Sequence, residues 1–438
     1  MLKALGAIFA GILVSFYLFP VEFTFLPGVN TKMMLAAVGL AVCAIRMIQQ
    51  KTPSIGRGLL MIFVLAAVVS LCGIFSMVVN STQDMSYASY IVTVSVWLSG
   101  ALTACSAIKA IHGHISLKLV ANYLLGVCLF QCASALLIDN YVIVRNITSM
   151  IFNLSQGYMQ SIHRLYGIGA ALDVAGIRFS AVIVLICFLL TYRSKDLSGF
   201  EIWYYIIGLV LLVITGDMIA RTTIIGIAIG AVGVVLKYIL LYLGNHFDTD
   251  RRISRRLLAT VLIAIPVSVI VFNSSTKAES LFRFAFEGFF SIVETGRWQT
   301  DSNDKLETMI VFPDNAKTWT IGDGYFENPG KSDINFLGEI TVGNFYMGTD
   351  IGYLRFIFYF GIIGLLAFTA FIFCAARACA EKRPDCSVLF YLLFLTNMVI
   401  WFKVATDLFC VLALMVCTTY LEDGPEENTE KPCDSSTT

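Results

Sequence analysis

The sequence predicts an all-α protein that crosses a membrane about twelve times. Of its 438 residues, 58% are hydrophobic and 14% are charged, whereas ordinary soluble domains are roughly 45–50% apolar and 25% charged. Apolar runs of about 17–25 residues recur along the chain, each long enough to cross a hydrocarbon core of ~30 Å. The formal net charge is zero, so the overall charge predicts no binding to nucleic acid.

Twelve apolar runs are the predicted spans, and the last two are short and closely joined. Together they form one integral membrane domain, residues 1–420, and the acidic residues 421–438 are predicted to be a disordered tail. The predicted spans are Ala4–Phe19, Met33–Ile48, Leu59–Val79, Tyr87–Ile108, Leu117–Ile138, Ile177–Tyr192, Phe200–Thr215, Thr222–Leu243, Leu257–Phe272, Ile351–Ala376, Val388–Trp401 and Val404–Tyr420.

The basic residues predict how these spans are oriented. Clusters of Lys and Arg lie in alternate connections, including Arg251–Arg256 and Arg377–Arg383, while the short connections between them carry almost none. Cytoplasmic connections of membrane proteins are enriched in Lys and Arg. Both termini are therefore predicted to be cytoplasmic, with the loops 139–176 and 273–349 facing outward. The second of these loops, before the tenth helix, is the longest polar interval in the chain.

This second outer loop is the predicted working region. Its apolar stretch Ser280–Glu294 fits a helix lying in the membrane interface, or equally a helix packed on top of the bundle. At its end, Asp350 fits either a helix N-cap or a general base that accepts a proton from a sugar hydroxyl. At ~100° per residue, Asp350 and Tyr353 would share one helix face and Arg355 would point about 140° away, toward another partner.

Seven outward arginines lie in the loops or at the ends of spans. Each alone fits a snorkelling membrane anchor. Taken together, they suit a diphosphate, because its oxygens accept paired hydrogen bonds from guanidinium groups. These arginines are Arg145, Arg164, Arg178, Arg221, Arg283, Arg297 and Arg355.

The outward face offers no pattern of metal ligands. His163 is the one histidine of four predicted to face outward, and Glu22 is the sole carboxylate of the first outer connection. No outward His lies at metal-ligand spacing from Asp or Glu. No metal and no cofactor are therefore predicted. Lys403 and Asp407, four residues apart, are predicted to form a local ion pair.

Three segments between Ser161 and Gly364 carry a resemblance to a known family. They are Arg164-Leu-Tyr-Gly167 followed by Asp173; Thr215–Gly226, which contains Arg221-Thr-Thr; and Trp298 through Gly322-Asp-Gly324, then Thr349–Gly364. In these segments and in its hydropathy profile, the chain resembles the O-antigen polymerase and O-antigen ligase superfamily of bacterial envelopes.

The resemblance implies metal-independent, inverting glycosyl transfer by a GT-C-like helical fold at the periplasmic face of the bacterial inner membrane. It implies a glycan donor on undecaprenyl diphosphate, with Arg221 and Arg164 at the diphosphate. Asp350 stands where ligases carry the His of a His-Asn pair. Polymerases of the family often carry Asp there, so the resemblance favours a polymerase of O-antigen or capsule repeat units.

The remaining candidates follow from the same implication. Arg178, Arg297, Tyr353 and His163 are expected to contact the substrate. The expected partners are the bilayer, the lipid-linked oligosaccharide, and a chain-length regulator and flippase of the same pathway. Two alternatives stay open: a ligase that transfers glycan to lipid A-core, and a lipid-glycan flippase or other transporter. A transporter should show an internal repeat and mid-span ionisable residues, which the sequence does not show.

Overall fold

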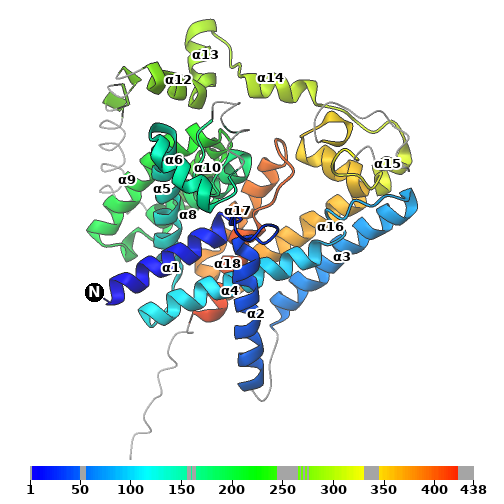
Figure 1. The fold of residues 1–438 in the computed structure, drawn as a ribbon, viewed down its shortest axis with the longest axis horizontal. Coiled ribbons are helices and arrows are strands. Elements are labelled where there is room, and N and C mark those ends of the chain that lie inside the picture. The colour runs from blue at the N-terminus through cyan, green and yellow to red at the C-terminus, as the bar shows by residue number, and fades with distance from the viewer. Residues whose placement is uncertain are drawn as a thin grey trace, which may run out of the picture.

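The computed structural model describes residues 2–49, 56–154, 159, 164–243, 265–266, 268–269, 272–273, 276–329 and 345–422. Within these ranges the secondary structure is helical, apart from isolated β-bridges such as Phe23 with Phe152. Seven of the helices are long and apolar enough to cross a membrane. The chain is therefore a helical, polytopic, membrane-embedded protein (Figure 1).

A helix lies at each of the other eleven predicted spans; of the ninth, 257–272, only residues 265–266, 268–269 and 272 are described, and these are helical. The number of crossings stays a prediction. The seven long apolar helices are α2 (Thr31–Gln49), α3 (Arg57–Asn80), α4 (Tyr90–His112), α5 (Leu117–Asn140), α8 (Leu172–Tyr192), α9 (Gly199–Ile219) and α16 (Gly352–Lys382). The other apolar helices are α1 (Leu2–Leu18), α6 (Val142–Ile151), α10 (Thr223–Leu243), α17 (Ser387–Ile400) and α18 (Phe409–Leu421).

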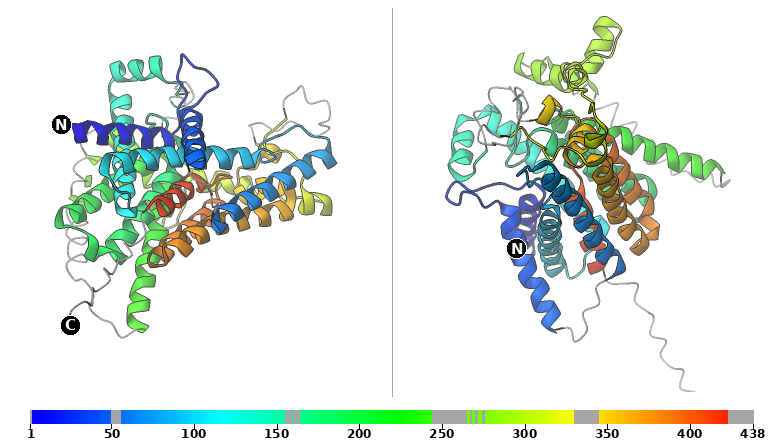
Figure 2. Two further views of the ribbon diagram at one scale, coloured as in Figure 1. Left: turned by 90° about the horizontal axis from the view of Figure 1, so that it is seen from below. Right: turned by 90° about the vertical axis from the view of Figure 1, so that its right-hand side faces the viewer.

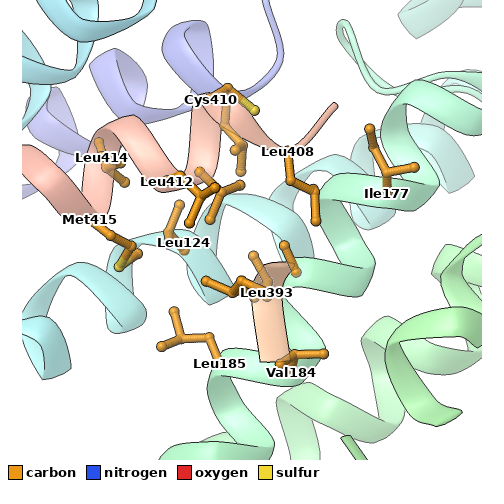
Figure 3. Close-up of a cluster of buried hydrophobic side chains, with 14 of the residues drawn as sticks. Leu124, Ile177, Val184, Leu185, Leu393, Leu408, Cys410, Leu412, Leu414 and Met415 are labelled. Atoms are coloured by element: carbon orange, nitrogen blue, oxygen red, sulfur yellow. The ribbon is translucent and has the colours of Figure 1, made fainter. Parts of the chain in front are cut away.

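Helix α8 lies at the centre of the bundle. Nearly every side chain from Ala175 to Leu190 is buried, and α8 packs against α5, α9, α10 and α17. Figure 3 shows how Val184 and Leu185 of α8 meet Leu124 of α5 and Leu393 of α17. A helix that is apolar on all sides is expected in such a position. Because α8 is packed against four helices, the polar residues of its first turn are held in fixed positions.

Helix α16 is broken at Phe360 and Gly361, and the second outer loop fills the break. Gly361 has φ +69°, and a side chain there would meet the Thr320 carbonyl oxygen at 2.1 Å. The Asp323 and Gly324 amides donate hydrogen bonds of 2.6 and 3.1 Å to the carbonyls of Phe358 and Tyr359. A broken helix at membrane depth must have its freed carbonyls satisfied by other donors. The turn around Asp323 therefore fixes the loop to the bundle.

The described part of the second outer loop forms four short helices. Figures 1 and 2 show α12, α13 and α14 projecting from one end of the bundle. The prediction of one helix over Ser280–Glu294 is wrong, because the helix ends before Phe286 and a second one begins after it. Lys277 also forms a 2.7 Å ion pair with Asp139, at the end of α5. The four helices are α12 (Thr276–Ala285), α13 (Glu287–Thr295), α14 (Asp301–Thr308) and α15 (Ala316–Ile321).

Candidate functional site

Arg221 lies in the break between α9 and α10, just after Ala220, whose backbone is extended. Its guanidinium forms an ion pair with Glu287, the first residue of α13, and its side chain is 15% exposed. The contact is not a well-aligned hydrogen bond, and Arg221 Nε has no hydrogen-bond partner. Burial lowers the pKa of the Arg221 guanidinium, and Glu287 opposes that shift. In the sequence the nearest acidic residue to Arg221 is Asp217, but in the structure Arg221 pairs with Glu287 instead.

Arg164 and Arg221 meet at one aromatic ring. The guanidinium carbons of Arg221 and Arg164 lie 4.1 and 5.1 Å from the centroid of the Phe284 ring in α12. A guanidinium within about 6 Å of a ring centroid is attracted by the negative face of that ring. The two arginines that the resemblance assigns to a diphosphate are thus neighbours, although they come from different segments of the chain.

Asp173, in the first turn of α8, holds a third cation, Lys403, in this region. The Thr222 hydroxyl donates a hydrogen bond to the Asp173 carboxylate, and Lys403 Nζ lies 3.3 Å from the same carboxylate. The predicted ion pair between Lys403 and Asp407 is therefore wrong. Helix α18 begins only at Phe409, so helical i,i+4 spacing does not apply. Instead, Asp407 accepts hydrogen bonds from the Tyr90 hydroxyl at 3.2 Å and from the Phe409 amide at 2.8 Å.

These segments enclose a cavity of about 200 Å³, which we call the Arg221 cavity. Asp217 is 2% exposed, and its Oδ1 has no hydrogen-bond partner. Polar and aromatic side chains from the α9–α10 break, α13 and the connection before α18 thus share one space. Among the lining residues are Asp217, Arg221, Thr222, Glu287, Trp298 and Lys403.

Asp350 lies just before α16 and is partly buried. It is not the N-cap, because that position is Ile351, whose amide donates to the Thr349 hydroxyl at 3.3 Å. The expectation that Arg355 would pair elsewhere is also wrong, since Arg355 Nη1 lies 3.5 Å from Asp350 Oδ1. The reason is that α16 begins at Gly352, so the helical period does not extend back to Asp350.

Arg355 is held firmly, which fixes its position beside Asp350. Its guanidinium carbon is 3.7 Å from the centroid of the Phe326 ring and 4.6 Å from that of Phe345, and Nη2 donates a 3.0 Å hydrogen bond to the Phe326 carbonyl. Burial raises the pKa of the Asp350 carboxyl to about 6, while Arg355 limits the rise. The charges of Asp173 and Lys403 also act on Asp350, so Asp350 lies near the polar residues around the Arg221 cavity.

The other predicted site residues that the structure describes do not line the Arg221 cavity. The Tyr353 hydroxyl donates a 2.9 Å hydrogen bond to the Met398 carbonyl, and its ring packs 4.9 Å from Phe402. Tyr353 therefore holds α16 against the end of α17. Arg297 is exposed and lines neither the Arg221 cavity nor the cavity that contains Arg178. His163 lies outside the described residues.

Sequence reasoning missed Glu287, Phe284 and the role of Lys403. A signal does exist for Glu287 and Phe284, because both fall in the stretch Ser280–Glu294, which the sequence predicts to be a helix at the membrane interface or on top of the bundle. Their pairing with Arg164 and Arg221 joins distant segments of the chain and could not be deduced from spacing. For Lys403, the local ion pair with Asp407 was the more obvious interpretation.

Because the comparisons with known proteins identify no relative, the function is inferred from the chemistry of this site. No family model, curated protein or solved structure matches the chain. Within the described residues, no group of three or more His, Cys, Asp or Glu side chains is placed to hold a metal ion. The cavity has two cations in its wall, Arg221 and Lys403, and Arg164 lies beside Arg221 on the Phe284 ring. The charge of Lys403 acts on the partly buried carboxylate Asp350.

Proposed function

We propose that the protein is a polysaccharide polymerase that joins undecaprenyl-diphosphate-linked repeat units by metal-independent, inverting glycosyl transfer. The observation that carries this proposal is that Arg221 and Lys403 line the Arg221 cavity and that Arg164 shares the Phe284 ring with Arg221. A diphosphate presents several anionic oxygens at short range, and guanidinium groups bind such oxygens through paired hydrogen bonds. A grouping of this kind therefore fits the head of a lipid-linked donor.

Binding of the diphosphate would replace the contact between Arg221 and Glu287. Arg221 Nε is free to donate, and a diphosphate oxygen in the cavity would accept from Nε as well as from the Nη atoms. Arg164, on the same Phe284 ring, would approach a second oxygen. Negative charge grows on the diphosphate as its bond to the sugar breaks, so these fixed cations would stabilise the transition state.

Asp350 would act as the general base. Its pKa of about 6 leaves it ionised at neutral pH, yet basic enough to accept a proton. In the proposed step, the acceptor hydroxyl oxygen bonds to the anomeric carbon, the bond from that carbon to the diphosphate oxygen breaks, and the hydroxyl proton passes to Asp350. A single displacement of this kind inverts the anomeric configuration.

We place this reaction at the periplasmic face of the bacterial inner membrane, in a GT-C-like fold with both termini in the cytoplasm. The support is the alternation of Lys and Arg clusters between connections. In this orientation α12–α14 lie outside the membrane, where a sugar chain can extend into water. The chain-length regulator and flippase of the same pathway would be its partners.

A deletion strain and a reconstituted reaction test the proposal together. Loss of the surface-polysaccharide ladder with one repeat retained is the result expected for a polymerase. Loss of every repeat would instead indicate a ligase or a flippase. Purified protein in liposomes, given only the lipid-linked repeat unit, should form polymer. Product that appears only when lipid A-core is added would identify a ligase, and no product with either acceptor would reject the proposal.

A further inference from the structure

A second cavity, of about 410 Å³, lies on another side of α8; we call it the Arg178 cavity. Its walls come from the α1–α2 connection, α4, the segment around Tyr166, and α8. Arg178 follows Asp173 by five residues on α8, so at ~100° per residue the two point about 140° apart. Asp173 faces Thr222 and Lys403, whereas Arg178 faces the rings of Phe19 and Trp97.

Two cations converge on one aromatic ring in the Arg178 cavity. Lys32 Nζ lies 4.8 Å from the centroid of the Trp97 ring, and the Arg178 guanidinium carbon lies 5.8 Å from it. Arg178 is only 7% exposed, yet its Nε has no hydrogen-bond partner. A buried N–H of a cation without a hydrogen-bond partner is unfavourable unless something else satisfies it.

The carboxylates near these cations are engaged elsewhere. Glu22 lines the cavity, but its Oε1 accepts a 2.5 Å hydrogen bond from the Gly28 amide. Asp407 accepts from Tyr90 and Phe409. The Cys410 thiol lies close enough to Arg178 to interact with it, but a thiol is a weak partner. Neither Lys32 nor Arg178 forms an ion pair with another described residue, in contrast to Arg221 with Glu287.

The surroundings of the Arg178 cavity point to a membrane lipid. The α1–α2 connection is joined to α6, since Thr24 donates hydrogen bonds to the carbonyls of Met150 and Ile151. Along α6, Ile143 and Met150 are 74% and 77% exposed. Helices with one exposed apolar face lie at the boundary between head groups and acyl chains. The cavity beside α6 is thus positioned at head-group level.

We propose that the Arg178 cavity is a second binding site for a phosphate oxyanion, carried by the head group of a membrane lipid. Lys32 and Arg178 would bind the phosphate oxygens, and Arg178 Nε would gain the partner that it lacks. This inference rests on the geometry of the cavity and does not depend on the proposed function. If that function holds, two lipid-linked diphosphates can bind at once, one in each cavity.

The test measures lipid binding to the full-length protein in phosphatidylcholine nanodiscs by native mass spectrometry, with undecaprenyl diphosphate as the probe. An Arg221→Ala background weakens the other cavity. In this background the diphosphate lipid should still bind, and the neutral alcohol undecaprenol should not. Adding Lys32→Gln should weaken binding at least about tenfold, as expected for the loss of a charge-assisted contact. Arg46→Gln, on the same helix α2, should change it less than twofold.

Further measurements distinguish a lipid phosphate from a soluble one and separate a loss of binding from misfolding. If inorganic pyrophosphate binds as tightly as the lipid, the site takes a soluble oxyanion, and the oxyanion class stands. If neither probe binds, or if Lys32→Gln binds as well as its parent, the inference is overturned. Arg178→Gln is expected to behave like Lys32→Gln. Because Arg178 is buried and its replacement can misfold, the partly exposed Lys32 decides the outcome.

Discussion

The Arg221 cavity and the Arg178 cavity both bring two cations to one aromatic ring, but they differ in how those cations are paired. At the Arg221 cavity, Glu287 forms an ion pair with the Arg221 guanidinium, and Asp173 forms one with Lys403. At the Arg178 cavity, the cations have no ion-pair partner among the described residues, and its acidic wall residue Glu22 is tied to a backbone amide. In the first cavity a wall carboxylate, Glu287, is paired with a wall cation; in the second, the wall carboxylate Glu22 is not.

The difference indicates two modes of anion binding. A ligand that enters the Arg221 cavity must displace Glu287 on α13, so binding there is coupled to movement of a short helix in the outer loop. A ligand that enters the Arg178 cavity displaces no carboxylate. Asp350, whose raised pKa suits a base, is influenced by the charge of Lys403, which lines the Arg221 cavity. We therefore expect chemistry at the first cavity and binding alone at the second.

The largest expected effect is that of Asp350→Asn, which tests whether chemistry belongs to the Arg221 side. Loss of a general base should lower the rate of polymer formation about 10²–10⁴-fold. In the wild type, the pKa of about 6 means that activity should fall as the pH drops through 6, where Asp350 becomes protonated. Rates of the reconstituted enzyme between pH 5 and 8 check both statements. A normal rate in the variant would leave Asp350 as a partner of Arg355 only.

Thermal unfolding separates this effect from a folding defect. The pKa of Asp350 is raised from 3.8 to about 6 by burial, so the folded protein binds the proton more tightly than the unfolded chain. Ionisation of Asp350 therefore destabilises the fold as the pH rises from about 4 to 6. Asp350→Asn should unfold at the same or a higher temperature than the wild type at pH 7, and any advantage should vanish at pH 4. Asp301→Asn, exposed in the same loop, is the control.

Arg221→Ala is expected to lower polymer formation about 10²–10³-fold, as for the loss of one donor to a developing negative charge. Arg221→Lys should restore little of this, because an ammonium group lacks the paired donors of a guanidinium. Arg283→Ala removes an exposed arginine of the same outer loop, which pairs with Glu279 and Glu294, and should keep its rate. The readout is the polysaccharide ladder at equal protein levels in the membrane. A full ladder from Arg221→Ala would remove the contrast between the two cavities.

A smaller effect, of the opposite sign, is expected for Glu287→Gln. This change removes the carboxylate that competes with the diphosphate but keeps the shape of α13. The two side chains of the pair are 15% and 26% exposed, and a partly exposed ion pair contributes about 1 kcal/mol, so KM should fall roughly fivefold. Glu294 also lies in α13, and Glu294→Gln breaks its exposed ion pair with Arg283 of α12; this variant should leave KM unchanged. An increase in KM for Glu287→Gln would mean that Glu287 contacts the substrate directly.

The sequence predicts the spans well and the site only in part. Span positions depend on local hydropathy, and the predicted spans that fall in the described ranges each coincide with a helix. The short helices of the two outer loops, α6 and α12–α15, are not among the predicted spans. Arg164 and Arg221 could be selected from motifs because each motif is continuous in sequence. Their meeting at Phe284 depends on how α12 folds over the α9–α10 break, and local patterns contain no information on that contact.

Two of the errors share one physical cause, which is the extension of helical periodicity beyond the ends of helices. Arg355 was placed away from Asp350, and Lys403 beside Asp407, by counting residues through positions that are not helical. The break of α16 at Gly361 was likewise invisible to hydropathy, because both halves of the helix are apolar. Only the glycine-rich turn 322–324 and its partner at Gly361 could have indicated it.

The smallest expected effect is that of chelation, which should leave the rate unchanged. A metal-dependent transferase neutralises the leaving diphosphate with a divalent ion held by carboxylates. At the Arg221 cavity, Glu287 is paired with Arg221, and Asp173 nearby is paired with Lys403. Asp217 is the remaining wall carboxylate, and no group of three or more described His, Cys, Asp or Glu is placed to hold a metal. Arg221 and Arg164 would supply the positive charge that a metal supplies elsewhere, so purified enzyme in EDTA should keep its rate. A tenfold loss that added Mg²⁺ or Mn²⁺ restores would show that the arginines bind substrate but do not carry the leaving charge. In that event the two cavities would be alike, each a binding site, and the contrast between them would fail.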